Sequence, residues 1–152
     1  MEFPDYIMLT PADVYNGLVD SPNEQLTRLR DFIHENKRVN NSYIQLLADK
    51  VRWYGKREAK RYAQLMGAEY RHFDGAMRCL TGMTAHRWIN EYLHLAACDL
   101  VAQTSFSFKK IGAIMGISSS SFSQFFRAYE GMQPWEYRSL KTLGKKHSFF
   151  YP

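Results

Sequence analysis

Residues 114–137 read "IMGISSSSFSQFFRAYEGMQPWEY", and this stretch repeats a pattern already present at residues 65–88, "LMGAEYRHFDGAMRCLTGMTAHRW". At an offset of 49 residues, the two stretches are identical at six of 24 positions. The identical pairs are Met66/Met115, Gly67/Gly116, Phe73/Phe122, Arg78/Arg127, Gly82/Gly131 and Met83/Met132. The repeat predicts that the chain contains two copies of one structural unit.

Each copy has the spacing of a helix-turn-helix unit. Two helices that cross steeply over a short turn need a small residue at the crossing and favour glycine where the backbone turns. In the second copy Gly112 precedes Gly116 by four residues, and Phe122 follows Gly116 by six. Residues 63–73 of the first copy have the same spacing. Two matches in one register predict two helix-turn-helix units.

The apolar periodicity extends this pattern into an all-α fold. We expect helix-turn-helix units near residues 57–80 and 107–130, joined by one linker helix near residues 84–102. No convincing alternation of apolar and polar residues predicts a strand, although "TSFSF" at 104–108 alternates in this way over five residues. The predicted fold class is therefore all-α, with two helix-turn-helix subdomains, a long linker helix and an N-terminal helical extension.

The N-terminal segment has weaker signals. The first 20 residues contain two prolines and no long period, so we expect them to be extended or loosely ordered. Ser21, Pro22 and Glu24 have the spacing of a capping box that begins a helix. The predicted helix has one apolar stripe, formed by Leu26, Leu29, Phe32 and Ile33. A second helix is predicted to start after Ser42.

These patterns divide the 152 residues into five predicted segments. They are an acidic, partly helical N-terminal extension (1–42), a first helix-turn-helix subdomain (43–83), the linker helix (84–102), a second helix-turn-helix subdomain (103–143) and a C-terminal tail (144–152).

Charge is distributed unevenly along the chain. Residues 1–35 contain seven acids and two bases, whereas residues 36–152 contain eighteen bases and eight acids, a net charge of +10. A basic body suggests a polyanionic partner, most simply nucleic acid, although a solvated surface of unequal charge is the alternative. No apolar run is long enough to cross a membrane, and the acidic N-terminus does not resemble a signal peptide. A cytoplasmic protein is expected.

Residues that could support catalysis or bind metal are sparse. Cys79 and Cys98 are too few for a disulfide framework, and because both stand in apolar stretches we expect buried thiols. His86 and His94 are eight residues apart, more than two helical turns. We predict no metal site, and the chain has no phosphate loop or nucleophile elbow. An enzyme is the least favoured class, and no cofactor is expected.

The second helix of each copy separates into an apolar and a polar face. The faces predicted to point into the core are Phe122, Phe125, Phe126 and Tyr129 in the second copy, and Phe73, Ala76, Met77 and Leu80 in the first. Trp88 on the linker helix should be buried as well.

The opposite faces are the candidate DNA-contacting surfaces. Their residues are Arg71, His72, Asp74, Gly75 and Arg78 in the first copy, and Ser119, Ser120, Ser121, Ser123, Gln124 and Arg127 in the second. Such side chains suit base edges and phosphates, and a serine run at a helix N-terminus suits a phosphate. We expect Arg71, Gln124 and Ser120 or Ser121 to contact bases, and Arg78 and Arg127 to hold phosphates. The alternative is that the serines form only a cap and a solvated face.

Residues 43–141 resemble the DNA-binding domain of the AraC/XylS family of bacterial transcription regulators. The most specific stretch is "FFRAYEGMQPWEYR", in which the residues similar to the family signature are Phe126, Arg127, Gly131, Pro134, Tyr137 and Arg138. "LTGMTAHRWI" is similar to the family's passage from the first recognition helix into the linker helix. The resemblance implies seven helices, binding to promoter DNA and no cofactor for this domain.

The chain departs from the family pattern in three places. The interval from Gly116 to Arg127 is one residue shorter than usual, and Leu93 stands where the linker helix commonly has arginine. Asp74 and Gly75 occupy outward positions that members often fill with long polar side chains. Because an acid facing phosphates is unfavourable, the first unit is expected to bind DNA more weakly. The chain has no room for the ligand-sensing domain common in the family, so it is either a stand-alone regulator or a fragment.

The leading hypothesis is a sequence-specific regulator that binds double-stranded promoter DNA and recruits or blocks RNA polymerase. A linker helix of about 18 residues spans about 27 Å, close to the separation of about 34 Å between successive major-groove segments. One alternative is a protein-interaction module that has lost DNA binding, which Asp74, Gly75 and the acidic leader favour. The basic side chains of Arg71, Arg78, Arg127, Lys109 and Lys110 oppose that alternative. A DNA-architectural accessory factor would use the same surface.

Overall fold

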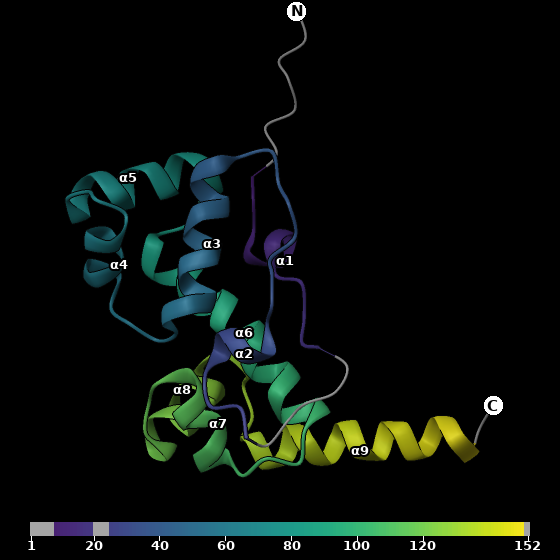
Figure 1. Ribbon diagram of the computed structural model, residues 1–152. Helices are drawn as coiled ribbons and strands as arrows, with labels where there is room; N and C mark the ends of the chain where they lie inside the picture. Colours follow the sequence, from purple (N-terminus) through teal and green to yellow (C-terminus); the bar gives the residue numbers. More distant parts are fainter. Residues whose placement is uncertain (1–7, 20–24, 151–152) are drawn as a thin grey trace, which may run out of the picture.

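A computed structural model describes residues 8–19 and 25–150, of which 143–150 are described as helix alone; this part of the chain forms helices and no strand (Figure 1). In chain order the helices are α1 (Pro11–Val14), α2 (Leu29–Phe32), α3 (Ser42–Tyr54), α4 (Ala59–Leu65), α5 (Tyr70–Thr81), α6 (Ala85–Gln103), α7 (Phe108–Met115), α8 (Ser119–Glu130) and α9 (Pro134–Phe150). The predicted all-α class is confirmed. None of the described helices combines the length and the apolarity needed to cross a membrane.

Helix α6 is the central element of the core. It begins where Thr84 Oγ1 accepts a hydrogen bond from the Arg87 backbone N–H at 3.1 Å, and it contacts α1, α3, α4, α5, α7, α8 and α9. Trp88 and Leu93 on this helix are fully buried. Leu93, where the family commonly has arginine, is therefore a core residue. Figure 1 shows the α4–α5 pair and the α7–α8 pair on the same side of the body, one above the other.

The two helix pairs have the predicted helix-turn-helix form. The turns contain Gly67 at φ +71° and Gly116 at φ +87°, a region that side chains with a Cβ rarely adopt. Gly112 stands where α7 and α8 cross, and a Cβ there would lie 3.0 Å from the carbonyl oxygen of Ile117. The small residue at the crossing is thus needed for close backbone approach.

The predicted core faces are largely confirmed. Phe73, Met77, Trp88, Phe122 and Phe126 are fully buried, and Phe125 is 9% exposed. Ala76, Leu80 and Tyr129 are only half-buried, because they lie at the edges of the apolar stripes.

The loop that precedes the first helix-turn-helix unit contacts the second unit directly. The backbone N–H of Lys56, in the loop between α3 and α4, donates to the carbonyl oxygen of Met115 at the end of α7 over 3.0 Å. A Cβ at Gly55 would lie 3.0 Å from the same oxygen, so this loop approaches α7 closely. The relative position of the units therefore depends on this contact as well as on α6.

The N-terminal segment differs from the sequence prediction. The capping box at Ser21–Glu24 lies outside the described residues, and residues 25–28 are not helical. Helix α2 is only four residues long, and it begins after Arg28, whose backbone N–H donates a hydrogen bond to the Asp31 carboxylate at 3.1 Å. The predicted long helix is therefore wrong over this part of the segment.

Residues 8–19 are more ordered than the sequence suggested. The Asp13 carboxylate accepts hydrogen bonds from the backbone N–H and hydroxyl of Thr10, at 2.7 and 2.9 Å, and Pro11 begins α1. Val14 is completely buried, and the Tyr15 hydroxyl donates to Asp99 on α6 at 2.5 Å. The segment is part of the core, and a threonine, proline and aspartate at capping-box spacing was the signal that sequence analysis missed.

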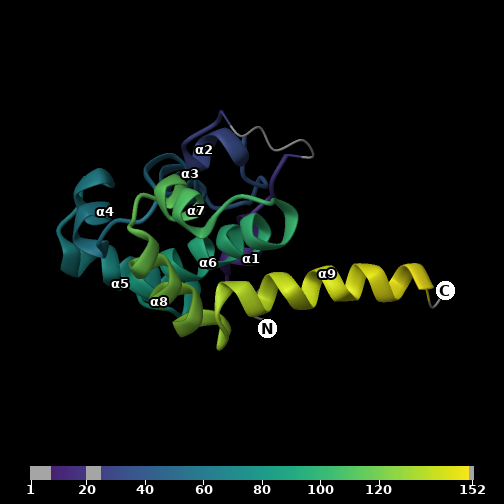
Figure 2. The ribbon, with the colours of Figure 1, turned by 90° about the horizontal axis from the view of Figure 1, so that it is seen from below.

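Helix α9 continues past residue 143, where a tail was predicted to begin. Figure 2 shows this helix extending away from the body. The division of the chain into five segments remains a prediction.

Candidate nucleic-acid interface

The first turn of α8 presents a row of hydroxyl groups. Ser118 caps the helix: its hydroxyl oxygen accepts the Ser121 backbone N–H at 3.2 Å and donates to the Ser121 hydroxyl at 2.9 Å. Ser119, Ser120 and Ser121 are exposed. The Ser121 backbone N–H is used by the cap, and the hydroxyls that follow Ser118 remain exposed. This geometry is compatible with DNA contact and equally with a cap and a solvated face.

The next turns of α8 continue this exposed face. Gln124 and Arg127 are exposed, whereas Ser123 is half-buried. The opposite side of the helix packs Phe122 and Phe126 into the core. This burial fixes the rotation of α8, so that Gln124 and Arg127 share the solvent-facing side with the serines.

Helix α5 exposes the corresponding face of the first unit. Arg71, His72, Gly75 and Arg78 are exposed, and a Cβ at Gly75 would meet no atom within 4 Å. Tyr70, the first residue of α5, is 39% exposed beside Arg71. This aromatic ring is not among the residues predicted from the sequence, although its position next to the N-cap Glu69 is a usable signal.

Asp74 does not face solvent as the sequence suggested. Its side chain is 16% exposed; one oxygen accepts the Ala85 backbone N–H at 2.8 Å, and the other accepts from Arg78 Nε at 2.9 Å. These two donors, the Ala85 N–H first, lower the pKa of the Asp74 carboxyl below its ordinary value. The first backbone N–H groups of a helix have no partner within that helix, and Asp74 supplies one for α6. The Asp74 carboxylate is thus paired with Arg78 and with the start of α6, rather than left without partners on the outward face.

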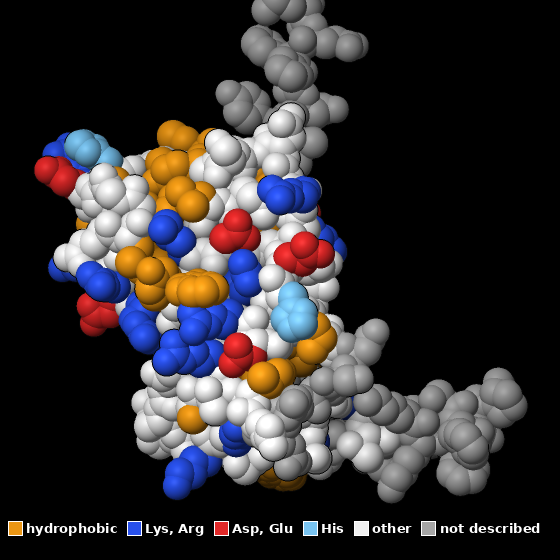
Figure 3. Space-filling view, in the orientation of Figure 1, with side chains coloured by type: hydrophobic (Ala, Val, Ile, Leu, Met, Phe, Trp, Pro, Cys, Tyr) orange, Lys and Arg blue, Asp and Glu red, His pale blue; other side chains and the backbone are white. Residues whose placement is uncertain are grey.

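A second group of basic side chains lines a pocket beside the turn between α7 and α8. Arg28, Arg30, Trp53 and Arg57 are among the residues that line a pocket of about 350 Å³ between α2, α3 and α7. The Arg30 guanidinium lies over the Trp53 ring at 3.9 Å. Basic side chains gather on this face in Figure 3, and Figure 2 places α6 and α7 between α2 and α8. The positive charge that the sequence predicted is thus spread over more than one face.

The cysteines also differ from the sequence prediction. Cys79 is exposed on α5 and Cys98 is half-buried on α6, so neither is a fully buried thiol. Cys98 lies together with His94 and Glu130, and the candidate ligand atoms of the three residues are within 4.8 Å of one another. The sequence prediction of no metal site considered His94 only with His86, whereas Cys98 is one helical turn from His94 on α6.

The comparisons with known proteins agree with this arrangement. The model of a helix-turn-helix domain family matches residues 62–139, just over half of the chain. No curated protein sequence matches the chain.

Several solved structures share the fold. An AraC-type transcriptional regulator from Chromobacterium violaceum is 20% identical, with a TM-score of 0.56, covering 66% of this chain and 92% of that one. A DNA-binding transcriptional dual regulator from Escherichia coli K-12 is 19% identical, with a TM-score of 0.58, covering 70% and 98%. The DNA-binding domain of AdpA, a global transcriptional factor in complex with a target DNA, is 25% identical, with a TM-score of 0.53, covering 62% and 90%.

One assignment follows from the two helix-turn-helix units on one linker helix, from the matching family model and from the shared fold. This chain belongs to the AraC/XylS family through its DNA-binding domain.

Proposed function

We propose that this protein is a sequence-specific transcription regulator that inserts α5 and α8 into adjacent major-groove segments of promoter DNA. The observation that carries the proposal is the pairing of two exposed polar helix faces on one rigid frame. Both helices bury their apolar sides, which leaves Arg71 and Arg78 exposed on α5 and Gln124 and Arg127 exposed on α8.

The length of the linker helix supports this proposal. Helix α6 contains 19 residues, a length of about 28 Å at about 1.5 Å per residue. Successive major-groove segments on one side of B-DNA are about 34 Å apart. The complex of the similar AdpA domain with its target DNA supports the same use of the fold.

We assign different roles to the exposed residues. Arg71 and Gln124, which stand on the exposed faces of α5 and α8, are the base readers, together with Ser120 or Ser121. Arg127 holds a phosphate. Arg78 does so more weakly because the carboxylate of Asp74 already compensates its charge. The remaining candidates stand next to these residues on α5 and α8; they are His72, Gly75, Ser119 and Ser123. Asp74 instead positions the start of α6.

Replacing either base reader should weaken binding and broaden sequence preference. For Arg71→Ala and Gln124→Ala we expect a loss of about 1–3 kcal/mol on the preferred site and relaxed preference at one or two base pairs. The preferred site is selected from a random duplex library with the parent protein, and the selection is then repeated with each variant. Arg38→Ala, an exposed arginine before α3, is the matched control.

The control should return the parent motif. If Arg71→Ala and Gln124→Ala also return that motif unaltered, α5 and α8 do not read the sequence. If the parent protein selects no motif at all, the proposal of a sequence-specific regulator fails.

Removing the phosphate-holding arginine should change the salt dependence instead. For Arg127→Ala we expect weaker binding on every sequence and a reduction of about one in the slope of log affinity against log salt concentration. Arg78→Ala should lower the slope less, because its charge is paired with Asp74. Binding to duplex DNA is measured across a salt series for the parent and both variants. An unchanged slope for Arg127→Ala would contradict the assignment of its role.

The same series tests the alternative of a protein-interaction module. A DNA-binding protein loses affinity steeply with salt because it displaces counterions from the phosphates, whereas an interaction module need not bind duplex DNA at all. The inward position of Asp74 removes one of the features that favoured the alternative.

A further inference from the structure

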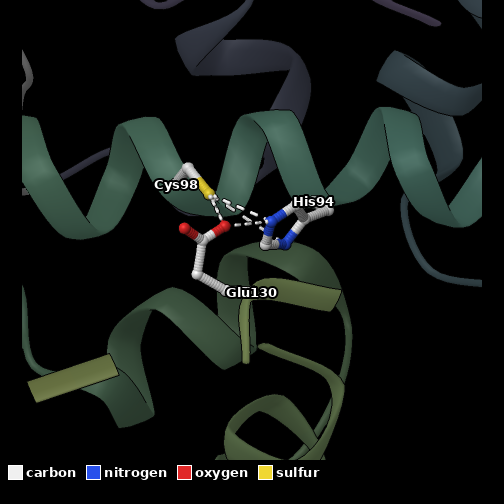
Figure 4. A group of neighbouring side chains, drawn as sticks. All are labelled: His94, Cys98 and Glu130. Atoms are coloured by element: carbon white, nitrogen blue, oxygen red, sulfur yellow. Dashed lines mark hydrogen bonds and ion pairs between the residues drawn. The ribbon is translucent and has the colours of Figure 1, made fainter. Parts of the chain in front are cut away.

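His94, Cys98 and Glu130 bring three metal-ligating groups to one point between α6 and α8 (Figure 4). His94 and Cys98 are one turn apart on α6, so their side chains lie on the same face of that helix. Glu130 is the last residue of α8. The side chains of His94 and Glu130 are 13% and 27% exposed, so the cluster is largely enclosed.

The distances within the cluster resemble three edges of a tetrahedron. His94 Nε2 lies 2.7 Å from Glu130 Oε2 and 3.3 Å from Cys98 Sγ, and Sγ lies 3.6 Å from Oε2. Tetrahedral Zn²⁺ with ordinary bond lengths of about 2.0 Å to nitrogen and oxygen and about 2.3 Å to sulfur separates such ligands by about 3.3–3.6 Å. Two of the three separations already match, and the third requires the imidazole and carboxylate to part by about 0.6 Å.

The surroundings hold the imidazole in place. The rings of Phe125, Phe126 and Tyr129 lie 6.4, 5.5 and 5.9 Å from the His94 ring, centroid to centroid. The Tyr137 side chain acts on Cys98 in the direction that lowers the pKa of its thiol, which favours the thiolate form. Such outer partners orient the ligands of a metal site and stabilise their charge.

A pocket of about 240 Å³ lies beside His94 and is also lined by Tyr129, Thr10, Ala12 and Glu91. It reaches one member of the cluster, since neither Cys98 nor Glu130 lines it. Burial, with the charge of Glu130 next, raises the pKa of the Cys98 thiol to about 12. Metal binding accordingly displaces a proton from this thiol.

We propose that His94, Cys98 and Glu130 form a site for a thiophilic divalent cation of the Zn²⁺ class. One thiolate, one imidazole and one carboxylate suit Zn²⁺, whereas Mg²⁺ and Ca²⁺ prefer oxygen ligands alone. The ion would join the C-terminal end of α8 to the middle of α6. The proposed base contacts on α8 precede Glu130 by at least six residues, whereas Arg127 stands in the same last turn of the helix and is exposed to solvent.

Metal binding by the purified full chain is the first measurement. Zn²⁺ is titrated in competition with a chromophoric chelator, and Co²⁺ is added as a spectroscopic probe of thiolate coordination. Cys98→Ser should abolish the thiolate-to-Co²⁺ charge-transfer band and weaken Zn²⁺ binding by at least about 100-fold, because losing an outer-shell partner alone costs about 10–100-fold. Glu130→Gln should weaken Zn²⁺ binding while keeping the band. Cys79→Ser, which removes the exposed cysteine on α5, is the matched control and should change neither.

A second measurement needs no variant at the site. In the parent protein, Zn²⁺ should slow alkylation of Cys98 and leave that of exposed Cys79 unchanged, as followed by peptide mass spectrometry. At about 100 times its dissociation constant, Zn²⁺ should raise Tm by roughly 5–10 °C. Absence of Zn²⁺ binding, equal protection of both cysteines, or loss of the Co²⁺ band in Cys79→Ser would each overturn the proposal. In that event, the three residues form only a hydrogen-bonded cluster.

Discussion

Phe126→Ala lowers the free energy of unfolding by about 3–5 kcal/mol, the range expected for a fully buried phenylalanine. Phe126 is 0% exposed. Its ring lies 5.9 Å from that of Phe122 and 5.4 Å from that of Tyr137, so it joins α8 to α9. Truncation leaves a cavity between these helices that rigid neighbours fill only in part, and the lost contacts add to the lost burial.

The measurement is equilibrium denaturation followed by circular dichroism. Trp135→Ala is the control, because Trp135 is equally aromatic but 62% exposed on α9; its effect should stay within about 0.5 kcal/mol. An unchanged denaturation midpoint for Phe126→Ala would show that the apolar side of α8 does not form the core.

Trp88→Ala should destabilise the protein by a similar amount, about 3–5 kcal/mol. Trp88 is completely buried on α6, where its ring stacks on that of Tyr92 at 6.1 Å. Its indole N–H also donates to the Leu9 carbonyl oxygen at 3.0 Å, which attaches the N-terminal segment to the linker helix. The substitution therefore removes packing and a long-range hydrogen bond together.

Trp88→Phe separates these two contributions. Phenylalanine retains an aromatic ring but cannot donate to Leu9, so we expect a smaller loss of about 1–3 kcal/mol from the unsatisfied carbonyl and the reduced volume. Both variants are compared by urea denaturation. If Trp88→Phe were as damaging as Trp88→Ala, the hydrogen bond rather than packing would dominate at this position.

The helix-turn-helix units were predictable because their signals are local. Gly116 adopts a positive φ and Gly112 sits at a helix crossing, so the requirement for glycine arises within a few residues of each. The burial of Phe122 and Phe126 follows from helical periodicity in the same stretch. Such features are encoded in short windows, and the fold class followed from them.

The N-terminal segment shows where local signals failed. Val14 is isolated in a stretch without periodicity, yet it is completely buried. Helix α1 has four residues, too few for an apolar stripe to reveal it, and its stability depends on packing against α6. Residues 25–28 were predicted as helix but are not helical, because the Asp31 carboxylate caps the chain further along.

The candidate DNA interface was predictable only in part. Periodicity placed Arg71, Gln124 and Arg127 on exposed faces, where the structure has them. It also placed Asp74 outward, without indicating that the first backbone N–H of α6 would come within 2.8 Å of its carboxylate. That contact joins residues eleven positions apart and depends on how α5 and α6 meet.

The helices of the two repeated units, their turns and the buried side of each second helix can be predicted from the sequence, because they follow from backbone conformation and apolar periodicity over neighbouring residues. The meetings of polar groups across helices follow from tertiary packing instead. Glu130 reaches His94 across 36 residues, and Asp74 reaches the start of α6. Such contacts depend on the angles and offsets at which helices pack. These angles and offsets are set by the packing of side chains throughout the core, so no short stretch of sequence encodes them.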